Sequence, residues 1–158
     1  MFGIIKNSIL GLLVLIFQWM LGDIFSLYGL TPSFLVIFII YIGLTNSQLH
    51  AIWLGFFLGF IIDALASTDM MGITALALST VGYLSGIFHG RIVRIPVMVQ
   101  YLLYTGFLLV FFLLTVMISL QDSQFSTGNI VFLVLLPKTL YTLALLSVSF
   151  IVLKVGAE

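Results

Sequence analysis

The sequence contains no cysteine and very little charge. Charged residues make up 6% of its 158 positions, against about 25% in an average soluble protein. The absence of cysteine excludes disulfides, thiol catalysis and cysteine-ligated metals. Five basic and five acidic residues balance, so the chain lacks the excess positive charge that binding to nucleic acid requires. Its polar stretches are short, and we expect a single integral membrane domain over residues 1–158.

Apolar residues fill most of the chain instead. They make up 63% of it, and the mean hydropathy is +1.36, which predicts an all-α membrane protein. Six apolar stretches predict a compact six-transmembrane-helix bundle: residues 4–21, 32–44, 51–66, 73–88, 96–120 and 130–153. The second, third and fourth look about five residues short of the ~20 that a span needs, so they extend into their turns or one is re-entrant. Residues 67–69 are candidate caps for the fourth helix.

Basic residues predict how the six helices are oriented. Lysine and arginine collect on the cytoplasmic flanks of membrane helices. In a six-span layout, four of them fall on the same side: Lys6, Arg91, Arg94 and Lys154. Both termini are therefore expected in the cytoplasm. Arg91 and Arg94 form a cytoplasmic basic turn, which serves as a topology signal or contacts anionic lipid or a partner.

Glycines recur at every fourth position in two neighbouring helices. Gly55 and Gly59 share one face of the third helix, and the same spacing places Gly82, Gly86 and Gly90 on one face of the fourth. In a membrane, small residues at this spacing let helix backbones approach and gain dispersion contacts. We expect both faces to pack against helices rather than lipid.

Two charged residues, Asp63 and Lys138, lie inside apolar stretches. The six-span layout puts both at similar depth in the outer half of a ~30 Å core. Either charge left alone costs roughly 2.5 to 3.5 kcal/mol on insertion scales, so one hypothesis is an intramembrane charge pair, direct or bridged by water. Alternatively, Lys138 extends to the interface, or Asp63 lies near the surface because its helix ends early. Pro137 predicts a kink beside the lysine.

No catalytic or metal-binding pattern is visible. His50 and His89 fall in turns, far from any carboxylate cluster, and no cofactor is predicted. The serines and threonines lack a histidine or lysine at a catalytic spacing. We therefore expect no enzyme activity. An intramembrane enzyme is the weakest alternative, with only Asp63 and Lys138 as loose candidates for its chemistry.

One region carries a recognisable pattern. Two glycines four apart and an aspartate four positions later lead through a short loop to Gly-x-x-Ala-Leu, then to Gly-Tyr-x-x-Gly and a basic residue. The residues are Gly55, Phe56, Gly59, Asp63, Gly72, Ala75, Leu76, Gly82, Tyr83, Gly86 and Arg91. This pattern resembles the rod shape-determining protein MreD family, and Thr31-Pro32 and Tyr41 also look like it. Departures are Phe60, where the family usually has leucine, and the lack of a glycine at residues 66–67.

The resemblance implies a six-helix protein of the bacterial cytoplasmic (inner) membrane, similar in fold to the substrate-binding subunits of energy-coupling-factor transporters. It also implies a non-enzymatic scaffold of the cell-elongation complex (elongasome), which serves rod shape and peptidoglycan synthesis. The partners implied are MreC and, through it, MreB, RodA and a class B penicillin-binding transpeptidase. The alternative function is a substrate-binding subunit of a vitamin-type transporter. Against it, residues 4–21 lack the alanine-x-x-x-alanine pattern with which such subunits dock their coupling protein.

Overall fold

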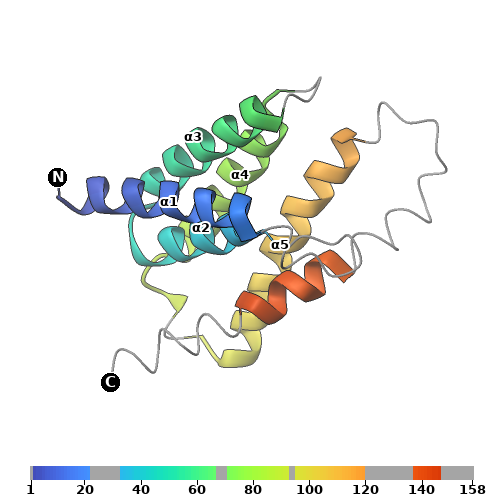
Figure 1. Cartoon of the computed structure of the whole chain (residues 1–158). Coiled ribbons are helices and arrows are strands. Elements are labelled where there is room, and N and C mark those ends of the chain that lie inside the picture. Colours follow the sequence, from blue (N-terminus) through green and yellow to red (C-terminus); the bar gives the residue numbers. More distant parts are fainter. Residues whose placement is uncertain (1, 22–32, 67–70, 93–94, 120–136, 147–158) are drawn as a thin grey trace.

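The computed structural model describes residues 2–21, 33–66, 71–92, 95–119 and 137–146. Within these ranges every regular element is a helix (Figure 1). The helices are α1 (Phe2–Leu21), α2 (Phe34–Thr45), α3 (Gln48–Ala66), α4 (Ile73–Ile87), α5 (Val97–Ser119) and a C-terminal segment at 137–146. The prediction of an all-α fold is confirmed for this part of the chain.

The observed helices follow the predicted ones with one shift. α3 begins at Gln48, so His50 lies in its first turn rather than in a connecting turn. The carbonyl oxygen of Ser47 accepts the Ala51 N–H at 3.2 Å, and the Ser47 hydroxyl forms a hydrogen bond with Nδ1 of His50. Ser47 therefore starts the helix earlier than the apolar pattern indicated. The helix predicted at 130–153 is described only at 137–146, so both of its ends lie outside the described residues.

Two of the described helices have the length and composition of membrane spans. These spans are Gln48–Leu65 in α3 and Val97–Val116 in α5, whereas Lys6–Met20, α2 and α4 are apolar but shorter. Large apolar side chains also cover the outside of the molecule, and Trp53 on α3 is 59% exposed. Such an outer surface suits lipid rather than water.

α2 is the central helix of the described part and contacts α1, α3, α4 and α5. Its sequence, FLVIFIIYIGLT, carries no charged residue. Val36, Ile39 and Ile40 are completely buried. A helix that is apolar all round belongs inside a protein or a membrane. Because lipid is as apolar as these side chains, close packing against the neighbouring helices holds α2 in place.

α3 and α4 form the most extensive helix pair, and they run antiparallel (Figure 1). A Cβ atom built on Gly59 would lie 2.5 Å from the Cα of Ala75, and one on Gly55 would lie 2.7 Å from the carbonyl oxygen of Leu78. Real Cβ atoms essentially never approach so closely. At both positions the backbone of α4 occupies the space that a side chain on α3 would need.

The glycines of α4 meet α3 in the same way. A Cβ built on Gly82 would lie 2.7 Å from the carbonyl oxygen of Ala51, and one on Gly86 would lie 2.6 Å from the Cβ of Gln48. We call Gly55, Gly59, Gly82 and Gly86 the glycine seam. Gly90 is not part of it, because α4 ends at Ile87 and Gly90 turns away with φ 68° and nothing within 4 Å of its Cβ position.

The seam makes a prediction with a matched control. Gly59→Ala should lower the free energy of unfolding by about 1 to 3 kcal/mol, because the added methyl group forces α3 and α4 apart. Gly106→Ala in α5 is the control, since its Cβ position has nothing within 4 Å, and it should be neutral or slightly stabilising. Unfolding in mild detergent measures both. Equal stability of the two variants would contradict the packing.

Candidate functional site

Asp63 is a buried carboxylate on α3 that binds the start of α4. Its side chain is 4% exposed. Oδ2 accepts the backbone N–H of Gly72 at 3.0 Å, of Thr74 at 3.0 Å and of Ala75 at 3.2 Å. The first N–H groups of a helix have no partner within it. A side chain from a different helix therefore supplies the cap.

The local sequence explains why the cap comes from a distance. The N-cap residue of α4 is Gly72, at φ 101°, and it has no side chain with which to cap. The local caps expected at residues 67–69 are therefore not the N-cap. A carboxylate at a helix N-terminus complements the helix dipole, and its hydrogen bonds are strong because the acceptor is charged. Asp63 thus couples the end of α3 to the beginning of α4.

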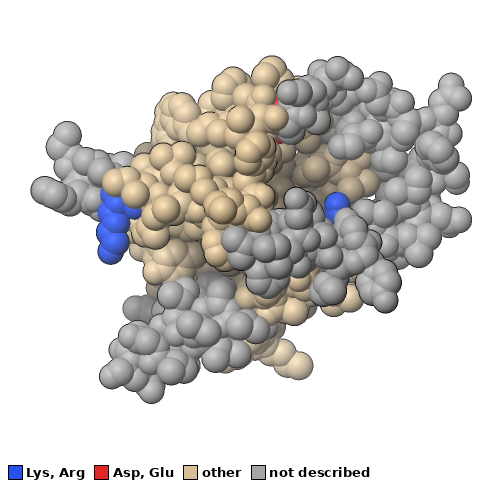
Figure 2. Space-filling model, in the orientation of Figure 1, with Lys and Arg blue, Asp and Glu red and all other residues tan. Residues whose placement is uncertain are grey.

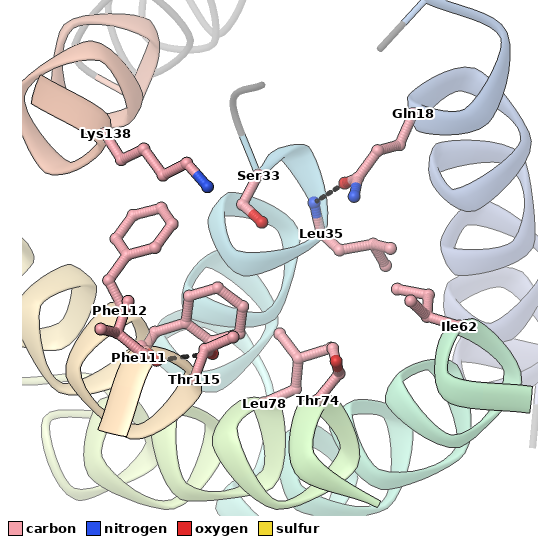
Figure 3. A pocket seen from close by; sticks show the side chains of 11 residues that line it. Gln18, Ser33, Leu35, Ile62, Thr74, Leu78, Phe111, Phe112, Thr115 and Lys138 are labelled. Carbon is pink, nitrogen blue, oxygen red and sulfur yellow. Dashed lines mark hydrogen bonds between the residues drawn. The ribbon is translucent and has the colours of Figure 1, made fainter. Parts of the chain in front are cut away.

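Lys138 lines a cavity of about 210 Å³ to which α1 to α5 and the 137–146 segment all contribute. Figure 3 shows its ammonium group pointing into this space. Phe111 and Phe112 of α5 form an apolar wall, and Thr74 of α4 adds a hydroxyl group. Figure 2 shows a hollow on this face, with basic and acidic atoms at its edge and uncharged residues in the part of its floor that the structure describes.

The structure brings Asp63 and Lys138 to the same region without a direct ion pair between these two described residues. Ile62 and Thr74 line the cavity, and both are close neighbours of Asp63, by sequence and by hydrogen bond respectively. The carboxylate is already satisfied by backbone N–H groups, which removes its need for the lysine. A pair of Asp63 and Lys138 that is bridged by water is a proposal, which the double-mutant cycle described below tests.

The other residues singled out by the sequence serve packing or face outward. Phe56 is 44% exposed and stacks on Phe60, with ring centroids 6.3 Å apart. Tyr83 is exposed, and its carbonyl oxygen accepts a hydrogen bond from Nε2 of Gln48 at 3.2 Å. Arg91 lies exposed in the turn after α4. Arg94 and the segment that precedes Pro137, with its expected kink, lie outside the described residues.

Sequence reasoning missed Gln18. Its Oε1 accepts the Leu35 N–H at 3.0 Å and so caps α2 from α1. The sequence signal that could have identified it is a glutamine near the end of an otherwise apolar helix. His50 bonds within its own turn, to Ser47, whereas His89 reaches a different helix, since its Nδ1 lies 3.1 Å from the carbonyl oxygen of Leu44 in α2. Within the described ranges, no three histidine or acidic residues gather into a metal-binding cluster.

Together these features define a helical membrane protein in which the polar side chains of Asp63 and Gln18 join one helix to the start of another. The sequence profile of the rod shape-determining protein MreD family matches residues 3–154. The chain belongs to this family, and the resemblance seen in the sequence is confirmed. The protein is thus a membrane component of cell-shape determination, from a family not known to contain enzymes.

The other comparisons add no relative. Neither a curated protein nor a solved structure matches the chain significantly. The expected similarity of fold to energy-coupling-factor subunits, and the transporter alternative, therefore gain no support from these comparisons.

The Asp63 cap is tested by substitution. Asp63→Ala should lower the free energy of unfolding by about 1 to 3 kcal/mol, because three buried or partly buried N–H groups lose their acceptor, and Asp63→Asn should recover part of that loss. Thr80→Ala is the control, since its hydroxyl group bonds only to the Leu76 carbonyl of its own helix. Equal, small effects of Asp63→Ala and Thr80→Ala on unfolding would contradict the cap.

The water-bridged pair is tested by a double-mutant cycle. Asp63→Asn, Lys138→Met and the double variant are compared by unfolding in detergent. Coupling well above the ~0.6 kcal/mol average of membrane hydrogen bonds supports the pair. Additive losses would show that each residue has separate partners.

Proposed function

We propose that this protein is a non-enzymatic scaffold of the bacterial cell-elongation complex. It binds MreC directly and, through MreC, associates with MreB, RodA and a class B penicillin-binding transpeptidase. The observation that carries the proposal is the family match over residues 3–154. These partners come from the family resemblance, and the binding of each is part of the proposal.

The described structure supports a role in binding rather than in chemistry. Every buried side-chain nitrogen or oxygen in the described part has a hydrogen-bond partner. Asp63 and Gln18, the polar groups that stand out inside the apolar helices, hold the starts of α4 and α2. Groups engaged in this way fix the framework and leave a defined outer surface for other proteins.

We also propose six membrane spans, with both termini on the cytoplasmic side of the inner membrane. The support is the one-sided distribution of Lys6, Arg91, Arg94 and Lys154. α2 has 12 residues and is about 18 Å long, shorter than a ~30 Å hydrocarbon core. Local thinning of the bilayer accommodates a short helix at modest cost, and α2 is largely covered by its neighbours.

Reporter fusions test this topology. A reporter active only outside the cytoplasm should be silent when fused after residue 158 and active when inserted at residues 121–129. A reporter active only in the cytoplasm should show the opposite pattern. An active external reporter at the C-terminus would contradict the proposed orientation.

The scaffold role is tested in the native host. The chain should copurify with MreC, and its depletion should turn rods into wide or round cells. Complementation with the parent chain should restore the shape, as should the Gly106→Ala variant. Unchanged cell width after depletion would contradict the scaffold. Growth rescued by an added vitamin, with shape unaffected, would instead support the transporter alternative.

A further inference from the structure

The cavity beside Lys138 has a polar end with three hydrogen-bond donors. Figure 3 shows the Lys138 ammonium group pointing toward the hydroxyl group of Ser33. Ser33 is the N-cap residue of α2, yet its side chain makes no capping hydrogen bond. Gln18 reaches the same end from α1, and its Oε1 is used by the Leu35 N–H, which leaves its amide N–H groups as further donors.

The charge of Lys138 lacks a carboxylate partner in the described part of the chain. Asp63 is the only acidic residue in the described ranges, and backbone N–H groups of the α4 start occupy its carboxylate. Charged residues at membrane depth pair with an opposite charge or mark a binding path, because an isolated one is unfavourable. An anion in the cavity would give Lys138 such a partner.

The start of α2 adds positive potential at the same end. Ser33 and Leu35 both line the cavity, and a helix N-terminus carries a partial positive charge. At α4 the carboxylate of Asp63 offsets this charge, whereas at α2 the capping group from Gln18 is a neutral amide. The positive potential at the start of α2 therefore favours an anion in the cavity. The main contribution to binding an anion comes from the charge of Lys138.

The remaining wall and the size of the cavity restrict the ligand. Phe111, Phe112, Ile62 and Leu78 make much of the lining apolar. The volume of about 210 Å³ is smaller than the roughly 300 to 1,000 Å³ of pockets that enclose drug-sized ligands. It therefore fits a compact charged group, with any long apolar chain lying outside it.

We propose that this cavity binds the compact oxyanionic headgroup of a membrane amphiphile. Lys138 provides the charge, and Ser33 and Gln18 donate hydrogen bonds to the oxygens. A phosphate suits this chemistry, because the lysine ammonium group binds it as a point charge. An amphiphile enters from the bilayer, whereas a free anion would have to leave water. This site goes beyond the proposed function and does not depend on binding to MreC.

The test uses the full chain purified in a neutral detergent. It is titrated separately with phosphatidic acid, with phosphatidylcholine of the same acyl chains, and with inorganic phosphate. The midpoint of thermal unfolding and the number of lipids retained in native mass spectrometry are measured. Phosphatidic acid should raise the midpoint as its concentration rises, as a ligand of the folded state does, and the other two should leave it unchanged.

Variants assign the effect to the cavity. Lys138→Met keeps the apolar stem and should weaken the binding of phosphatidic acid roughly tenfold or more, because the charge is lost. Lys138→Arg keeps the charge and should retain most of the binding. Ser33→Ala should weaken it several-fold. Lys6→Met is the matched control, since Lys6 is an exposed lysine on α1 outside the cavity, and it should bind as the parent does.

Three results would overturn the proposal. Equal retention of phosphatidic acid by the parent, Lys138→Met and Ser33→Ala would show that the lipid binds elsewhere. Equal effects of phosphatidylcholine, whose phosphate is capped by a bulky choline cation, would exclude selection of a compact headgroup with net negative charge. A full, Lys138-dependent shift with inorganic phosphate alone would make the ligand a free anion and not an amphiphile. Because mass spectrometry counts bound lipid directly, a change in the stability of Lys138→Met does not obscure the outcome.

Discussion

The contact between the Asp63 carboxylate and the first N–H groups of α4 fixes α3 against α4, the helix pair with the most extensive packing in the described structure. Ala75 takes part twice, because its N–H donates to Asp63 and its Cα lies only 2.5 Å from the position of a Cβ built on Gly59. Gly59 and Asp63 are one helical turn apart, so cap and glycine seam form one continuous contact along α3. Breaking the hydrogen bonds would also loosen the close approach of the two backbones.

The two charges inside apolar helices have different roles. Asp63 is satisfied by the protein itself, because an acceptor-only carboxylate matches a row of unpaired backbone donors. Lys138 forms no ion pair with Asp63, and its ammonium group points into a cavity instead. In a membrane the same physical requirement, that every charge find a partner, thus gives Asp63 a structural role and motivates the binding role that we propose for Lys138.

Features set by local periodicity were predictable from the sequence, and features set by distant contacts were not. Apolar stretches predicted α1, α4 and α5 closely, and the four-residue spacing placed Gly55 and Gly59 on one face. That spacing could not tell that α4 ends before Gly90. Counting residues from the expected turns predicted that Asp63 and Lys138 lie at similar depth in the membrane. This residue count could not show that Gly72, the N-cap residue, leaves α4 without a local cap. The Asp63 carboxylate therefore accepts hydrogen bonds from the backbone N–H groups of α4 and not from Lys138.

The glycine seam and its cap also bear on the order of folding. The hydrogen bond from Gly72 to Asp63 spans 9 residues and that from Ala75 spans 12, so only a short loop must close to form them. The entropy lost on closing a loop grows with its length. The other contacts between helices close longer loops, because Gln18 meets the start of α2 across 17 residues and His89 meets Leu44 across 45. The α3–α4 hairpin is therefore expected to form early, and the hydrogen bonds that join more distant helices to form onto a hairpin that is already rigid.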